Sequence, residues 1–353
     1  MGKSYIFFCP ISHRPTGGVG FIYRVVDYLN SEKINAFVFH QAKNFSCKWL
    51  NHGNHIYCGS LNPSIHHLVI PENDVWQFSD FVTENHFSYS IFVQNGFYIP
   101  DKISSLIEED RIKLKMMYKS AQFIFSVSDY STELIRKFIS CDLEIIRIFT
   151  TPYLSECLHV IKKRRLISYM SRKNYTTSNR VIFGLSELID EGWEIIDINS
   201  NGPISENKLS DILSKTAIFL SFGTDEGLPA PPLEAANYGC TVVGYHGFGG
   251  LEYWKDYPFY LVPEGDIVTF IDEVKKVSKN YNFDSEILSY DSKFSYSYSK
   301  ITTINTFKKL NPNFSSSVKS INVQTSLLLY RLRIIINYIK KNIKEKIYKS
   351  QFL

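Results

Sequence analysis

One segment of the chain, residues 217–244, predicts a strand, a loop, a helix and a second strand in close succession. It begins with the apolar run 217–222 and ends with the apolar run 240–244, and both have the length of buried strands. Glu226 follows the first strand, and Glu234 is expected in the opening turn of the helix. Because ligands of open α/β sheets bind outside the carboxyl ends of the strands, both carboxylates are expected to face such a crevice.

The loop between the two glutamates combines a permissive position with rigid ones. Gly227 allows a close approach of the backbone to a ligand, and the three prolines within 229–232 stiffen the chain. A helix N-terminus also favours phosphate. We therefore expect Glu226 to contact a sugar ring, and Glu234, held on the helix, to accept hydrogen bonds from the vicinal hydroxyls of a ribose. The plain alternative is an ordinary loop and helix with solvated glutamates.

The full phrase from Glu226 to the strand 240–244 resembles the E-x7-E signature of retaining glycosyltransferases of the GT-B fold, in particular family 4. The spacing of two glutamates is common by chance, but the run of glycine, leucine, prolines and alanines between and after them is far more specific. The resemblance covers roughly residues 1–310. It implies two Rossmann-like doubly wound α/β domains that face a central cleft, with Gly227 and Leu228 among the substrate-binding residues.

The remainder of the chain alternates apolar strand-like runs with helical patterns, which favours parallel sheets. Strands are expected in the first half at 5–9, 36–39, 67–70, 89–93 and 123–127. Strands are expected in the second half at 166–169, 193–197, 218–222, 241–244 and 259–262. The predicted units are an N-terminal acceptor-binding domain at 1–155, a C-terminal nucleotide-sugar-binding domain at 165–310 and an extension at 311–353.

A glycine-rich loop is expected at residues 17–20, between the first strand and a helix at 21–29. Glycines allow backbone amides to approach a phosphate or a sugar. The pattern is neither G-x-G-x-x-G nor a Walker A motif, which argues against NAD and ATP. The resemblance implies that Gly17 and Gly18 line the donor–acceptor cleft; a tight turn is the alternative.

Two basic residues, Arg172 and Lys173, follow the first strand of the second domain. A guanidinium and an ammonium there can neutralise a diphosphate leaving group, and the resemblance implies this role in place of a metal ion. Many family members separate the two residues, so their adjacency leaves open which one reaches the phosphates. A solvated basic loop is the alternative.

Further positions are expected to line the cleft. Asn95 and its neighbour Gln94 stand where many relatives carry a histidine, and their amides can hydrogen-bond sugar hydroxyls. Gly249 and Gly250 match a glycine pair that the resemblance places close to the donor, and Glu252 is expected to be structural. Two other residues have simpler interpretations. His13 is expected to be an exposed histidine, and Ser128 is expected to cap a helix.

The sequence contains no D-x-D motif, which fits metal-independent chemistry, and no metal or other cofactor is expected. Its six cysteines form no C-x-x-C pair, which favours a reducing cytoplasm over a disulfide framework. No secretory signal and no run of 18 apolar residues is found, so neither export nor a transmembrane helix is expected.

The C-terminal residues 317–353 differ in character from the rest. Eight basic residues and one acidic residue give this segment a charge of +7, whereas the whole chain carries +4. Apolar residues recur at helical spacing between 328 and 347. These features predict a basic amphipathic helix, either on an anionic membrane surface or packed on protein. Nucleic acid is not favoured as a partner, because no recognised binding fold accompanies the basic stretch.

Together these patterns predict a retaining, metal-independent glycosyltransferase that uses a nucleotide diphosphate-sugar and a glycan or lipid-linked acceptor. The expected setting is the synthesis of a bacterial surface polysaccharide, such as capsule or lipopolysaccharide, in the cytoplasm or on the inner face of its membrane. Two alternatives remain: a non-catalytic subunit that binds a nucleotide-sugar or glycan, and a nucleotide-sugar 2-epimerase of the GT-B type.

Overall fold

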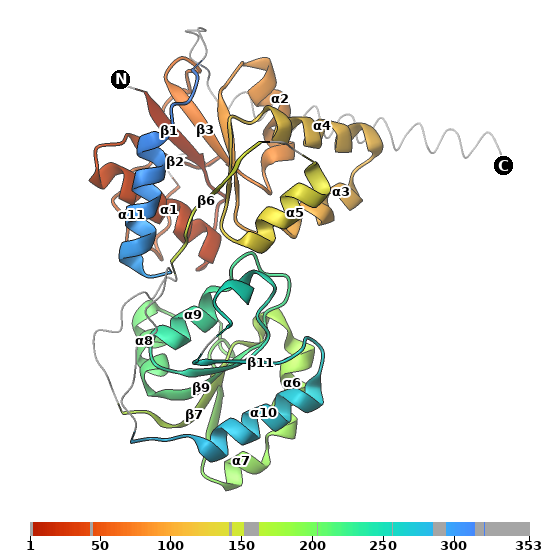
Figure 1. The fold of residues 1–353 in the computed structure, drawn as a ribbon. Helices are drawn as coiled ribbons and strands as arrows, with labels where there is room; N and C mark the ends of the chain where they lie inside the picture. The colour runs from red at the N-terminus through yellow and green to blue at the C-terminus, as the bar shows by residue number, and fades with distance from the viewer. Residues whose placement is uncertain are drawn as a thin grey trace, which may run out of the picture.

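A computed structural model of the chain describes residues 3–42, 45–140, 143–151, 162–202, 204–255, 257–284, 294–314 and 321. Two α/β domains follow one another, and each consists of one parallel sheet with helices packed on it (Figure 1). Every expected strand is present, with bounds that differ by at most two residues from those predicted.

The first domain holds a six-stranded sheet in the order β2-β1-β3-β4-β5-β6, with all neighbours parallel. The short edge strand β6 was not expected from the sequence. The elements of the first domain are β1 (Ser4–Phe8), α1 (Gly17–Ser31), β2 (Ala36–Phe39), β3 (His66–Pro71), α2 (Val75–Glu84), β4 (Tyr89–Val93), α3 (Tyr98–Ser105), α4 (Glu108–Ser120), β5 (Phe123–Ser126), α5 (Asp129–Ile139) and β6 (Ile145–Arg147).

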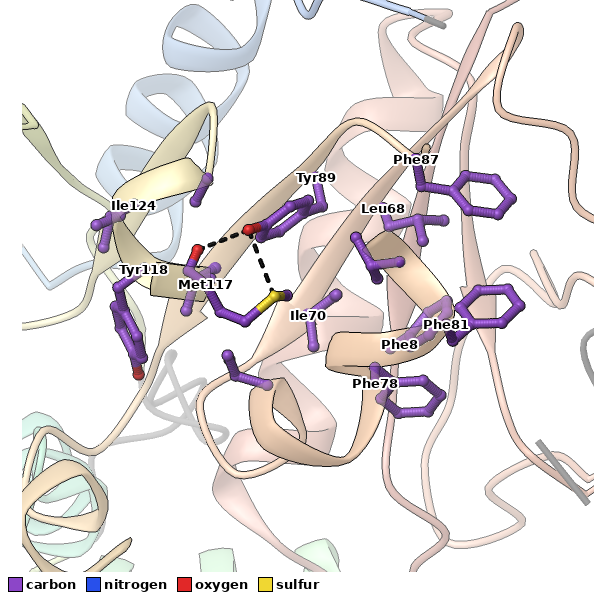
Figure 2. Packing of buried hydrophobic residues seen from close by; sticks show 14 of the residues in the cluster. Phe8, Leu68, Ile70, Phe78, Phe81, Phe87, Tyr89, Met117, Tyr118 and Ile124 are labelled. Carbon is purple, nitrogen blue, oxygen red and sulfur yellow. Dashed lines mark hydrogen bonds between the residues drawn. The ribbon is translucent and has the colours of Figure 1, made fainter. Parts of the chain in front are cut away.

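The central strands of this sheet are buried on both faces, which is why they read as continuous apolar runs. One face packs against α2 and α4 through the side chains in Figure 2. There the Tyr89 hydroxyl donates a hydrogen bond to the Met117 carbonyl at 2.7 Å, so the polar end of a buried ring is satisfied (Figure 2).

The second domain holds a five-stranded sheet in the order β11-β10-β9-β7-β8, again parallel throughout. Its elements are β7 (Arg164–Tyr169), the 3-10 turn η1 (Ser171–Lys173), α6 (Tyr175–Gly184), α7 (Glu187–Asp190), β8 (Glu194–Asp197), α8 (Glu206–Lys215), β9 (Thr216–Ser221), α9 (Ala230–Asn237), β10 (Thr241–Gly244), the 3-10 turn η2 (Gly249–Glu252), β11 (Phe259–Leu261) and α10 (Ile267–Asn280).

The last described helix, α11 (Tyr296–Lys309), returns to the first domain and lies beside α1 (Figure 1). Phe307 is buried there against the rings of Tyr5 and Phe125, and Tyr296 meets Tyr28 edge to face. The expected range 165–310 for the second domain is therefore wrong at its end. The sequence pattern of a helix does not show which sheet that helix covers, and here the contacts assign α11 to the first domain.

Part of the basic run 162–165, which lies where the two predicted domains meet, is buried. Lys163 is 5 % exposed, and its Nζ donates to the carbonyls of Leu213 and Tyr238 at 2.9 and 2.6 Å. These carbonyls lie at the C-terminal ends of α8 and α9, where a positive charge also complements the helix dipole. The second sheet begins at Arg164, one residue later.

The expected glycine loop is the first turn of a helix, because α1 begins at Gly17 after the N-cap Thr16. Ser128, in contrast, caps α5 as expected: its Oγ accepts a hydrogen bond from the Ser131 amide at 2.9 Å. The predicted C-terminal helix lies outside the described residues. Of the extension 311–353, the structure describes residues 311–314 and 321. Among the described residues, no helix has the length and apolar character needed to span a bilayer.

Candidate functional site at the domain junction

Lys173 and Glu226 meet at the carboxyl edge of the second sheet. Lys173 ends η1 after β7, and Glu226 lies in the loop after β9, the neighbouring strand. The Lys173 Nζ lies 2.8 Å from the Glu226 Oε1, and the two side chains are 40 % and 15 % exposed. An ion pair this open to water stabilises the fold by less than about 1 kcal/mol. Its importance is that it gathers an ammonium and a carboxylate in one place.

The turn that carries the two basic residues is fixed from the adjacent strand β8. Asp197, the last residue of β8, accepts hydrogen bonds from the Ser171 amide and hydroxyl. Asn174 then caps α6 by accepting from the Thr177 amide. Within this fixed turn Lys173 is directed to Glu226, while Arg172 is exposed to solvent.

The backbone around Glu226 is held by the turn that precedes η2. The Glu226 amide donates to the Gly247 carbonyl at 3.0 Å, and the Gly249 amide donates to the Glu226 carbonyl at 3.1 Å. A Cβ on Gly249 would lie 1.9 Å from the Gly227 carbonyl oxygen. Gly249 is therefore required for backbone packing against the Glu226 loop. Gly250 packs more loosely, since a Cβ there would lie 3.2 Å from the Pro229 ring.

Glu234 lies deeper than the sequence suggested. The helix α9 begins at Ala230, so Glu234 is its fifth residue and belongs to the second turn rather than the opening one. The residue is 5 % exposed. Its contact with a ribose therefore remains a prediction, and it requires the ligand to reach a largely buried carboxyl group.

A loop of the first domain, residues 94–97, contacts the Glu226 loop, and we call it the junction loop. The Asn95 Nδ2 donates to the Asp225 carbonyl at 2.9 Å, and the Asn95 Oδ1 accepts from the Phe97 amide at 3.1 Å. Both ends of this amide, which were expected to bind sugar hydroxyls, are thus bonded within the protein.

At Gly227 the backbones of the two domains approach each other closely. A Cβ at this position would lie 1.9 Å from the Gln94 carbonyl oxygen and 2.7 Å from the Asn95 Cα. The glycine was expected to admit a ligand, but in this structure it admits the backbone of the other domain. The next residue, Leu228, packs partly buried against the cores of both domains.

The two glycines at the start of α1 differ in their surroundings. A Cβ on Gly18 would lie 2.8 Å from the Gln94 Oε1, so Gly18 borders the junction loop. A Cβ on Gly17 would meet no heavy atom within 4 Å. His13, in the preceding loop, is exposed and packs edge to face on Phe45.

A second set of contacts joins the domains beside this site, where η2 lies against α5. Arg147 of the first domain and Glu252 of the second form two hydrogen bonds of 2.8 Å, and Glu252 also accepts from the Asp129 amide at 2.7 Å. Nearby, the ring of Tyr130 stacks on the rings of both Phe97 and Phe248, which also contact each other. Glu252 is structural, as expected, but its partner across the junction was not foreseen.

A buried acid of the first domain was not predicted from the sequence. Glu72 directly follows β3 and is 7 % exposed. Burial raises the pKa of its carboxyl to about 7, against the lowering effect of hydrogen bonds from the Gln94 and Asn95 amides. The signal for it in the sequence is an acidic residue immediately after the apolar run 68–71, at the sheet edge where ligands bind in this class of fold.

Comparison with known proteins supports the architecture. No family model and no curated protein matches the sequence. Among solved structures, sucrose-phosphate synthase from Thermosynechococcus elongatus is 11% identical, with a TM-score of 0.62 over 87% of this chain and 99% of that one. HepE from Anabaena in complex with UDP-glucose is 11% identical, with a TM-score of 0.59 over 87% of this chain and 100% of that one.

A third structure, the lipopolysaccharide outer core galactosyltransferase WaaB in its apo form, is 14% identical, with a TM-score of 0.54 over 87% of this chain and all of that one. These likenesses extend over both domains. They confirm the expected GT-B fold of two doubly wound α/β domains.

Proposed function

We propose that the protein is a retaining, metal-independent glycosyltransferase of the family 4 type, which transfers a sugar from a nucleotide diphosphate-sugar to a hydroxyl of a glycan or glycolipid. The pairing of Lys173 with Glu226, inside the phrase that resembles the family signature, carries the proposal. The names of the structural neighbours support it, since they include a galactosyltransferase and a protein bound to UDP-glucose.

The ion pair suggests how a donor is received. A diphosphate carries more negative charge than one carboxylate, so its arrival favours an exchange in which Lys173 leaves Glu226 for phosphate oxygens. Arg172, exposed on the same turn, is available for the same diphosphate. Glu226 is then free to position the donor sugar. The positive end of the α9 dipole also favours negative charge, and Ala230 supplies the backbone N–H of its first turn, because Pro231 and Pro232 have none.

In this mechanism the acceptor hydroxyl attacks on the face from which the diphosphate leaves, as the family resemblance implies, and no residue of the protein forms a covalent bond to the sugar. Charge neutralisation by Lys173 and Arg172 and the positioning of both substrates supply the catalysis. The absence of a D-x-D motif in the sequence supports chemistry without a metal ion.

The nucleotide is assigned to the second domain, with its ribose at Glu234. We expect a thermal-shift screen of UDP-, GDP- and other nucleotide-sugars to identify a stabilising donor, and we expect Glu234→Gln to weaken its affinity about tenfold, the effect of one charge-assisted hydrogen bond. Calorimetry measures the affinity. Glu206→Gln, an exposed change on α8, is the matched control. Equal affinities in wild type and Glu234→Gln would rule out the ribose role.

The acceptor is proposed to be lipid-linked, as in the synthesis of capsule or lipopolysaccharide on the inner face of the cytoplasmic membrane. This assignment rests on the basic segment 317–353 of the sequence. The kinship of the fold with a lipopolysaccharide galactosyltransferase is compatible with it.

A further inference from the structure

Glu72 is a buried carboxylate with two backbone partners from one loop. Its Oε1 accepts a hydrogen bond from the Asn95 amide at 2.8 Å, and its Oε2 accepts from the Gln94 amide at 3.1 Å. These amides belong to the start of the junction loop, immediately after β4. Because buried amides require an acceptor, the carboxylate satisfies two donors that no strand neighbour reaches.

The same loop is the surface on which the second domain rests. Its Asn95 side chain bonds to the Asp225 carbonyl, and its Gln94 carbonyl faces Gly227. Asp225 and Gly227 flank Glu226 on either side. The path from Glu72 to Glu226 therefore consists of two backbone hydrogen bonds, the junction loop and the two residues next to Glu226.

We propose that Glu72 is a positioning residue, whose carboxylate holds the junction loop in the conformation that receives the Asp225–Gly227 turn and so sets the place of Glu226 between the domains. Glu72 contacts neither substrate and acts through the loop. Its importance for sugar transfer rests on the function proposed above, whereas its effect on the junction does not.

The ionisation of Glu72 gives this role a pH dependence. Burial, and to a smaller extent the nearby Asp74 at the N-terminus of α2, raise the pKa of its carboxyl from 4.5 to about 7, against the lowering effect of the Gln94 and Asn95 amides. Asp74 also acts on the buried Cys9 thiol, whose pKa is raised by burial, by Cys47 and by Asp74. The ionised carboxylate accepts both amides fully, whereas protonation weakens one oxygen as an acceptor.

Two consequences have opposite signs. Transfer should rise as pH increases through about 7, because the ionised carboxylate holds the loop. Stability should fall as pH rises from 4.5 to about 7, because a group whose folded pKa is raised binds its proton more tightly in the folded state. Glu72→Gln should lower kcat about tenfold, which corresponds to one lost hydrogen bond, and should remove both trends near pH 7.

The decisive measurement is hydrogen–deuterium exchange of wild type, Glu72→Gln and the exposed control Glu109→Gln. We expect Glu72→Gln to speed exchange in residues 93–97 and also in 222–229 of the other domain, while Glu109→Gln changes neither. Faster exchange confined to 93–97 would show a role in the first domain alone and would overturn the proposal.

Outcomes with and without transferase activity remain distinguishable. If Glu72→Gln changes exchange at 222–229 but no donor is ever turned over, the proposed function fails and the positioning role stands. If Glu72→Gln does not fold, Asp74→Asn tests the same point. Removing that charge should lower the pKa of Glu72, so the midpoint of the pH profile of sugar transfer should move to lower pH than in wild type. An unmoved midpoint would overturn the proposal.

Discussion

Replacing Gly227 with alanine is expected to separate the two domains at the site and to reduce sugar transfer by about 100-fold or more, since a misplacement of about 1 Å has effects of that size. The added Cβ would lie 1.9 Å from the Gln94 carbonyl oxygen and 2.8 Å from the Gln94 carbonyl carbon. Both atoms belong to the backbone, and Glu72 accepts hydrogen bonds from the amides on either side of them. Rotation of a side chain therefore cannot relieve the overlap.

Small-angle scattering of Gly227→Ala measures this separation directly, as a larger radius of gyration than that of wild type. Gly17→Ala is the matched control for scattering, because its Cβ meets no heavy atom within 4 Å. The circular dichroism spectrum of Gly227→Ala should match that of wild type, because each domain keeps its secondary structure. A Gly227→Ala protein with the scattering curve and transfer rate of wild type would show that the domains do not approach each other at this glycine in solution.

The second large effect is expected at Arg147 and Glu252. Their side chains are 17 % and 6 % exposed, and they form two parallel hydrogen bonds across the junction. Arg147→Met removes the guanidinium that forms both of these bonds with the buried Glu252 carboxylate. Removing one partner of a buried pair costs about 3 kcal/mol of unfolding free energy or more, which urea denaturation measures.

The double variant Arg147→Met/Glu252→Met should recover part of this loss, because it removes the isolated charge as well as the pair. A surface pair serves as the control: Lys308 and Glu32 are 48 % and 44 % exposed, and Lys308→Met should cost less than about 1 kcal/mol. A loss at Arg147 no greater than that at Lys308 would mean that the pair does not hold the domains together.

Local patterns of the sequence were sufficient to predict much of the fold. All the strands from β1 to β11 except the short edge strand β6 follow predicted runs of four or five residues, and the strand–loop–helix around Glu226 could be placed because both flanking strands are unusually apolar. The Ser128 cap was also predictable, because the hydroxyl and its partner amide are only three residues apart in the sequence. Structure of this kind depends on residues that are close together in the sequence.

Contacts between distant segments were not predictable in this way. The pairs Asn95–Asp225 and Arg147–Glu252 join residues more than 100 positions apart, and no periodicity relates them. The return of α11 to the first domain, and the burial of Lys163 within a basic run, have the same origin. Gly227 is the instructive case: the need for a glycine was clear from the sequence, but the backbone that approaches it belongs to the other domain.

The central claim is that Glu226, paired with Lys173 at the domain junction, positions a nucleotide-bound sugar for transfer. The most direct measurement is the release of nucleoside diphosphate and the formation of glycosylated acceptor from the donor found in the thermal-shift screen, compared between wild type and Glu226→Gln. We predict a loss of about 100-fold in kcat with little change in nucleotide affinity, the size expected when a group that acts at the reacting sugar is removed. Turnover by Glu226→Gln at the wild-type rate would contradict the account.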